Sequence, residues 1–344
     1  MKYNRNHWEH MDDNTLDQFV VEIFNYYRSR GFPFYNLTID QQFEELNKMD
    51  KYYNSTEIIV DNKIKQTMHC LNVAWTYFDH AWSVRCHNQI SPMEAFEDDK
   101  KFQAVIRRRL KRGSYISDSG LRKGLRVSSG IQAVSNFRPT AARAIYDHYG
   151  GDGIVWDMSC GYGGRLLGAI SSRRVKHYIG TDPDTLTHSG LLKMVENLGN
   201  WNRASLFADK NNTFINIHNV GSEVFRPDKD SLDLCFTSPP YFNTEKYSTE
   251  DSQSYLKFPT KKLWLKNFLM KTIEHCVYGL KVGGFLLINI SNVKTYQDLE
   301  TAFVESVYSM FPQLIQKQTM DYLLSSSNTG GFKSEHIFVF QKEL

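Results

Sequence analysis

The sequence predicts an α/β fold, in which a Rossmann-like parallel sheet follows an N-terminal helical region. Two patterns support this prediction. An apolar run at 153–157 stops at a glycine-rich turn, and a helix pattern over 166–172 follows it. A second apolar run at 232–236 stops abruptly at Ser-Pro-Pro. In such sheets a ligand binds beyond the carboxyl ends of the strands, so both turns are candidate site elements.

The N-terminal region has helical periodicity. One helix face is formed by the apolar residues Leu16, Phe19, Val20, Ile23, Phe24 and Tyr27. The pattern ends at Gly31, and a second helical pattern is predicted over 64–84. The run 91–94 has the cap, the proline and the glutamate of a helix start. A helical module of this kind suits either a recognition domain or a structural cover.

The strongest charge bias lies at 107–126, a segment that contains eight basic residues and one acidic residue, Asp118. Interleaved glycines and serines predict a flexible basic linker, which we expect to contact phosphates. The candidates for nucleic-acid contact are Arg107, Arg108, Arg109, Lys111 and Arg112. The alternative is a solvated, charged helix end and linker.

The glycine-rich turn begins at Asp157, the last residue of the first predicted strand. Gly161 and Gly163 allow a tight turn and a close backbone approach to a ligand. Asp182 ends a second predicted strand, at about the 20-residue spacing of a ribose-binding carboxylate. Leu166 stands where a dinucleotide fingerprint needs a third glycine, and an acid at 157 suits a ligand with a positive centre and an ammonium group. S-adenosylmethionine is such a ligand.

The second turn reads Ser238-Pro239-Pro240-Tyr241. Two prolines fix two φ angles and remove two backbone donors, so this backbone is stiff and its carbonyls are able to accept hydrogen bonds. A hydroxyl, a carbonyl and a ring could therefore receive an exocyclic amine and stack on its base. The alternative is a strand followed by a proline-rich turn.

The segments after this turn complete the predicted sheet. The polar stretch 242–258, which contains Lys246 and Tyr247, is predicted to be a substrate-closing loop, with a disordered connector as the alternative. A helix is expected over 262–280, then a turn at 281–284. Further elements are expected as a strand at 285–290, a helix at 299–310, and strands at 315–324 and 336–340.

Composition is ordinary for a globular protein. Of the 344 residues, 41% are hydrophobic and 23% charged, and the net charge is only +3, so the chain is not a polycation. Its five cysteines lack CxxC spacing, which predicts free buried thiols in a reducing cytoplasm. No stretch reaches the length of a membrane span, and the histidines have no metal-ligand spacing. We therefore expect a cytoplasmic protein without a metal site.

Taken together, these motifs resemble the S-adenosylmethionine-dependent amino-methyltransferases that act on exocyclic amines of DNA bases. The resemblance covers about 127–344, implies a seven-stranded methyltransferase sheet, and leaves 1–126 as a helical region with the basic linker. It implies Ser238, Pro239, Pro240 and Tyr241 as catalytic residues. The cofactor would be held by Asp157, Ser159, Cys160, Gly161, Gly163, Asp182 and Ser222, and by Phe137 and Pro139 of a Phe-x-Pro element.

The implied reaction is direct methyl transfer to a base swung out of the DNA helix. In the family that the chain resembles, serine at the position of Ser238 favours N4 of cytosine over N6 of adenine as the methyl acceptor. DNA is the expected partner, and a role in restriction or defence would be compatible with the sequence. An RNA-base methyltransferase, a small-molecule or protein methyltransferase, and a non-catalytic nucleic-acid-binding protein remain as alternatives.

Overall fold

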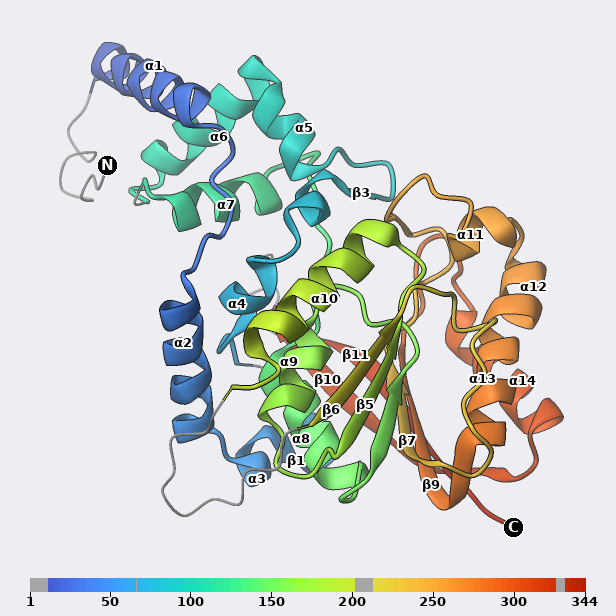
Figure 1. The fold of residues 1–344 in the computed structure, drawn as a ribbon. Helices are drawn as coiled ribbons and strands as arrows, with labels where there is room; N and C mark the ends of the chain where they lie inside the picture. The colour runs from blue at the N-terminus through green and yellow to red at the C-terminus, as the bar shows by residue number, and fades with distance from the viewer. Residues whose placement is uncertain (1–11, 66, 115, 202–212, 326–331) are drawn as a thin grey trace. The chain divides into compact units, whose positions relative to one another are not determined.

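The computed structural model describes residues 12–65, 67–114, 116–201, 213–325 and 332–344 (Figure 1). They form two compact units, each built from two separate stretches of chain. The first comprises Met1–Asn36 and Asp79–Ser135, and the second comprises Leu37–Phe78 and Asn136–Leu344. The predicted division placed all of 1–126 together, whereas contacts group 37–78 with the sheet.

The first unit is helical. Its elements are α1 (Asp13–Arg30), a 3-10 helix (Asp79–Ser83), β3 (Arg85–Cys86), α5 (Pro92–Glu97), α6 (Asp99–Lys111) and α7 (Asp118–Val127). The predicted face of α1 is confirmed, because Leu16, Val20, Ile23 and Tyr27 are buried. The capping box at Ser91 is also present.

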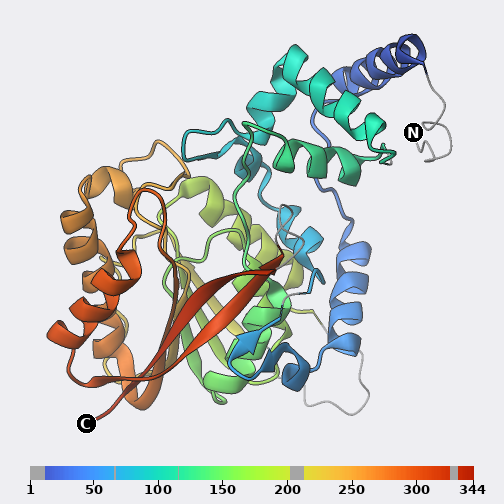
Figure 2. The ribbon, with the colours of Figure 1, turned by 180° about the vertical axis from the view of Figure 1, so that it is seen from behind.

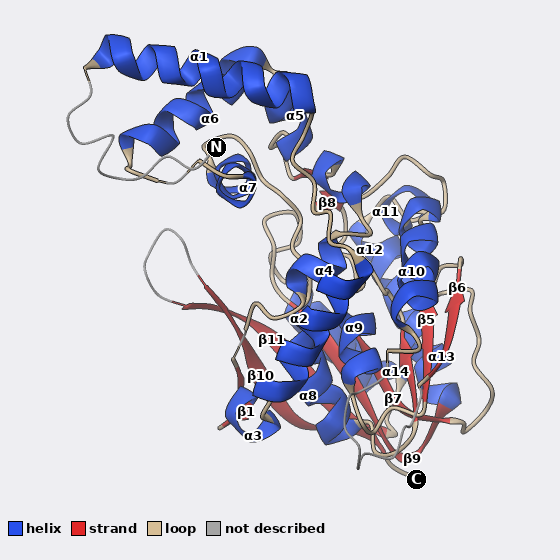
Figure 3. Ribbon diagram, turned by 60° about the vertical axis from the view of Figure 1, so that its left-hand side comes forward, coloured by secondary structure: helices blue, strands red, loops and turns tan. Residues whose placement is uncertain are grey.

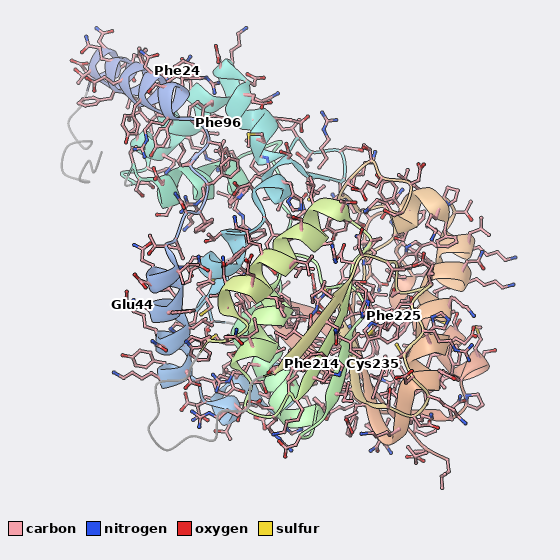
Figure 4. All side chains as sticks on the ribbon, viewed as in Figure 1. Phe24, Glu44, Phe96, Phe214, Phe225 and Cys235 are labelled. Carbon is pink, nitrogen blue, oxygen red and sulfur yellow. The ribbon has the colours of Figure 1, made fainter. Side chains whose placement is uncertain are left out.

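An aromatic cluster forms part of the core of this unit. Phe24 and Phe96, both labelled in Figure 4, pack on Phe102 with ring centroids 5.8 and 4.6 Å away. The Arg28 guanidinium lies 4.8–5.1 Å from the centroids of these three rings. Arg28 is thus a structural cation, stabilised by ring faces.

The prediction of a flexible basic linker at 107–126 is wrong, because most of this segment is helical. Arg107, Arg108, Arg109 and Lys111 lie in α6, and α7 begins six residues after Arg112. Ser117 caps α7 by accepting a hydrogen bond from the Gly120 N–H. The serine that suggested a loop therefore starts a helix.

The second unit contains the main sheet. The strands of this unit are β1 (Ile59–Val60), β2 (Lys63–Ile64), β4 (Ile154–Asp157), β5 (His177–Thr181), β6 (Phe214–His218), β7 (Leu232–Thr237), β8 (Glu245–Lys246), β9 (Leu280–Ile290), β10 (Leu314–Ser325) and β11 (Phe332–Lys342), of which β8 is not part of the main sheet. Its helices are α2 (Ile39–Tyr52), α3 (Ser55–Ile58), α4 (Leu71–Trp75), α8 (Pro139–Tyr149), α9 (Gly164–Ser171), α10 (Thr185–Leu198), α11 (Ser254–Lys257), α12 (Lys261–Trp264), a π-helix (Leu265–Leu269), α13 (Met270–Gly279) and α14 (Leu299–Met310).

The sheet has nine strands in the order β1-β2-β10-β11-β9-β7-β4-β5-β6. Strands β9, β7, β4, β5 and β6 are parallel, and β11 is antiparallel to both neighbours. The long pair β10 and β11 is seen in Figure 3. The predicted α/β, Rossmann-like class is confirmed, and the short strands β1 and β2 extend the sheet beyond the predicted seven.

Helices cover both faces of this sheet. Figures 1 and 2 show α8, α9 and α10 on one face and α13 and α14 on the other. Strands β4 and β7 are therefore buried almost throughout, which explains the continuous apolar runs in their sequences. Phe214, labelled in Figure 4, lies instead on the outer strand β6 and is exposed.

The connections create a switch in direction at β4. From β4 the chain runs to β5 and β6 on one side, and it then returns to β7 on the other side of β4. Ligands of open α/β sheets bind beyond the carboxyl ends of the strands at such a switch. The turns after β4 and β7 are the two that the sequence singled out.

Two other predicted elements differ from the structure. The helix expected over 64–84 is replaced by β2, α4 and a 3-10 helix. The chain leaves the second unit after Phe78 and enters the first at Asp79, so the apolar residues of 64–84 are divided between two units. The turn expected at 281–284 lies within β9.

All five cysteines are buried and free, as predicted. No described helix has the length and apolarity needed to cross a membrane.

Candidate functional site

The turn after β4 has the conformation that its glycines predict. Gly161 and Gly163 adopt φ values of 55° and 72°, in the left-handed region that favours glycine. Gly163 precedes α9, so the first N–H groups of the helix follow the turn directly. The Cys160 N–H donates to the Thr181 carbonyl at 3.0 Å, which fixes the turn against the end of β5. Its thiol is buried and faces Tyr178 rather than solvent.

Asp157, at the end of β4, is buried and fully engaged by protein donors. Its Oδ2 accepts from Arg165 Nε at 2.9 Å and from the Tyr178 hydroxyl at 2.7 Å. Its Oδ1 accepts from the Ser159 N–H at 3.3 Å and from the Thr237 hydroxyl at 3.2 Å. A carboxylate has about four acceptor positions, and all four are occupied. Asp157 therefore holds the turn together, and its contact with a cofactor stays a prediction.

Arg165 is the buried counter-ion of Asp157. Its guanidinium also donates to the Ser159 carbonyl. Burial disfavours the cation, yet the adjacent Asp157 carboxylate more than offsets this and raises the pKa of Arg165. This pair fastens α9 to the start of the turn.

Asp182 follows β5 and has spare acceptor capacity. Its Oδ2 accepts from the Gly161 N–H at 2.9 Å, and its Oδ1 accepts from the Asp184 N–H at 3.1 Å. Burial raises the pKa of Asp182 to about 7, against the lowering effect of these two hydrogen bonds. With respect to the described residues, each oxygen keeps one lone pair, which suits two neighbouring hydroxyls. The predicted carboxylate and the glycine turn are thus in contact.

The Phe-x-Pro element lies against the same turn. The Asn136 amide donates to the Tyr162 carbonyl at 2.7 Å, and a Cβ at Gly164 would meet the Phe137 carbonyl at 2.0 Å. Phe137 stacks on Tyr322 of β10 with centroids 4.5 Å apart, and Pro139 starts α8. The structure thereby brings together two motifs that are separated in sequence.

The Ser-Pro-Pro-Tyr turn follows β7, the neighbour of β4. The Ser238 and Tyr241 hydroxyl oxygens are 3.5 Å apart. The Tyr241 hydroxyl donates toward the Asn289 carbonyl and the Glu335 carboxylate, each at 3.2 Å. Burial, with a further contribution from Glu335, raises the pKa of Tyr241 well above its usual value, so it stays a neutral donor. Among the described residues, no donor bonds the Pro239 carbonyl.

The next residue, Phe242, has an uncommon backbone. Its φ is 56°, although it is not a glycine, and its ring is buried between Trp264 and Tyr296. Such conformations persist only where packing imposes them, and they cluster at functional sites. The Pro240 carbonyl accepts from the Phe242 N–H at 3.1 Å, which closes the turn.

The other residues predicted to bind cofactor or nucleic acid are not part of the two turns. Ser222 is buried, and its hydroxyl is paired with Thr272 at 2.8 Å. Lys246 is exposed in β8, and Tyr247 lies against Tyr162 with centroids 6.2 Å apart. In the first unit Arg107 pairs with Asp17, whereas Arg108 and Arg112 are exposed. Contact with nucleic acid stays a prediction for all of these basic residues.

Sequence reasoning missed the residues that support the site. These are Arg165, Tyr178, Thr237, Asn289, Tyr322 and Glu335. They come from α9, β5, β7, β9, β10 and β11, so no local pattern links them. Only the fold places them beside the two turns.

No family model and no curated protein matches. Among solved structures, an rRNA methylase from Streptococcus thermophilus is 15% identical, with a TM-score of 0.36, over 61% of this chain and 100% of that chain. TrmN from Thermus thermophilus is 14% identical, with a TM-score of 0.38, over 59% of this chain and 48% of that chain. The N-methyltransferase NodS from Bradyrhizobium japonicum is 11% identical, with a TM-score of 0.38, over 60% and 94%.

Proposed function

We propose that this chain transfers the methyl group of S-adenosylmethionine to an exocyclic amine of a nucleic-acid base. One observation carries the proposal. The glycine turn and the Ser-Pro-Pro-Tyr turn follow adjacent parallel strands at the switch point, and the hydrogen bond from Thr237 to Asp157 joins them. A cofactor site and an acceptor site would then lie side by side, as direct group transfer requires.

The cofactor side fits the nucleoside part of S-adenosylmethionine. Asp182 would accept its two ribose hydroxyls through the lone pairs that Gly161 and Asp184 leave open. The left-handed glycines let the backbone approach the ligand closely. When bound, the cofactor supplies a strongly electrophilic sulfonium methyl group.

The acceptor side fits a conjugated amine. Ser238 Oγ and the Pro239 carbonyl would accept its two N–H bonds and draw its lone pair out of conjugation. Tyr241, fixed by Asn289 and Glu335, would present its ring to the base. This chemistry aligns the reactants and needs no covalent intermediate.

The test is methyl transfer from labelled S-adenosylmethionine, with nucleoside mass spectrometry of the product. Duplex DNA, single-stranded DNA and RNA are compared in parallel, because all three present such amines. N4-methylcytosine or N6-methyladenine in DNA would match the sequence expectation. Label confined to RNA would keep the mechanism and assign RNA as substrate.

Two substitutions assign the roles. Ser238→Ala and Tyr241→Ala should lower turnover, Ser238→Ala by roughly 10²-fold, because a contact made in the transition state is lost. Cofactor affinity, measured by calorimetry, should stay within about twofold, since neither residue touches the glycine turn. Unchanged turnover in both variants would contradict the assignment.

A further inference from the structure

The segment 242–258, here called the strap, contacts three turns at the carboxyl edge of the sheet. At the glycine turn after β4, the Tyr247 ring lies against Tyr162. At the turn after β5, the Ser252 hydroxyl donates to the Pro183 carbonyl at 3.2 Å. At the turn after β6, Lys257 pairs with the buried carboxylate of Glu223. The strap therefore crosses the edge at which the cofactor would bind.

Glu250 makes the central attachment. Both of its carboxylate oxygens accept from the Thr185 N–H at 3.3 Å, and Oε2 also accepts from the Thr185 hydroxyl at 3.2 Å. The Ser252 hydroxyl lies 3.3 Å from the same oxygen. Thr185 is the first residue of α10, so the carboxylate also meets the positive end of a helix dipole.

This attachment lies close to the ribose acid in the chain. Asp182, Pro183, Asp184 and Thr185 are consecutive, and Asp182 also accepts from the Asp184 N–H. The turn that would hold the ribose is thus the turn to which Glu250 fastens the strap. The distal end of the strap is separately fixed, because Trp264 donates to Ser254 at 3.2 Å.

We propose that the strap closes over the bound cofactor, with Glu250 as the positioning residue that holds it shut. This inference rests on the proposed function. It changes the sequence expectation for 242–258 from a substrate-closing loop to an element that retains cofactor. A ligand held by Asp182 and the glycine turn leaves only after the strap detaches from those same two turns.

The experiment measures release of labelled S-adenosylmethionine from the full chain in a chase with unlabelled cofactor. Glu250→Ala should accelerate dissociation about three- to tenfold, because several exposed hydrogen bonds are lost. Single-turnover methyl transfer at saturating cofactor should change less than about twofold, so that KM for the cofactor rises while kcat is kept. Glu250→Gln retains an acceptor oxygen and should restore part of the slow release.

The matched control is Asp251→Ala, which removes the exposed carboxylate at the next position of the strap. Thr185→Val removes only one donor to Glu250 and should give a smaller acceleration, which keeps the test decisive if Glu250→Ala folds poorly. Equal release rates in Glu250→Ala, Thr185→Val and Asp251→Ala would overturn the strap inference alone. Failure of the unsubstituted chain to bind S-adenosylmethionine would overturn the proposed function, and this inference with it.

Discussion

Under the proposed function, Asp182 is the residue whose charge would most directly affect the binding of S-adenosylmethionine. Its pKa of about 7 means that half of the carboxyl groups are protonated near neutral pH. A protonated carboxyl loses acceptor capacity for the ribose hydroxyls. We therefore expect the Kd for S-adenosylmethionine to rise as pH falls through 7. Calorimetry between pH 5.5 and 8.5 measures this, and Asp182→Asn should bind weakly with little pH dependence.

The contribution of Asp182 to the stability of the fold has the opposite pH dependence to its contribution to ligand binding. Its folded pKa lies above the ordinary aspartate value of 3.8, so its contribution to stability is full below that value and is lost as pH rises through about 7. As pH rises from 5 to 8, the free energy of unfolding of apo Asp182→Asn should therefore increase relative to that of the unsubstituted chain. A difference that stays constant or reverses over this range would argue that Asp182 is already ionised at acidic pH.

The sequence predicts both aspartates as candidate site residues, but it does not predict the hydrogen-bond donors around Asp157. The spacing of Asp182 from the glycines predicts a ribose-binding acid, which stays a prediction, and its carboxylate accepts a hydrogen bond from the Gly161 N–H. The environment of Asp157 depends on Tyr178 and Thr237, which belong to other strands. A single sequence shows that an acid ends a strand, but it does not show which donors surround it.

At the scale of elements, the Arg165–Asp157 pair fastens α9 to β4, and the Tyr178 and Thr237 hydroxyls extend the link to β5 and β7. Arg165→Met should lower the free energy of unfolding by about 3–5 kcal/mol, because it leaves a buried carboxylate without its counter-ion. Urea unfolding measures this loss. Adding Asp157→Asn should recover part of it, and strictly additive losses would show that the two groups do not interact.

Elements were predicted well where one local pattern sufficed. Strands β4 and β7 are buried on both faces, so their sequences are continuously apolar. The basic region was mistaken for a linker because of its glycines. A Cβ at Gly124 would lie 2.9 Å from the Arg109 side chain and 3.0 Å from Val105, so this glycine permits close packing of α6 and α7. Close packing and flexibility leave the same sequence signal.

For the whole molecule, the division into two units places the glycine turn and the Ser-Pro-Pro-Tyr turn in one unit and the basic residues of α6 in the other. In the first unit Arg108 and Arg112 are exposed and form no ion pair with a described residue. Arg107, on the same helix, is paired with Asp17. Only charges free to meet phosphates release counter-ions on binding.

Replacing both Arg108 and Arg112 with Gln should therefore weaken binding of duplex DNA or RNA and reduce the slope of log K against log salt by about 1–2. Filter binding at several salt concentrations measures this slope. Arg107→Gln is the matched control, since it removes one charge from the same helix at a position that Asp17 already neutralises. If the double variant keeps the original slope, Arg108 and Arg112 belong only to a solvated surface and do not contact phosphates.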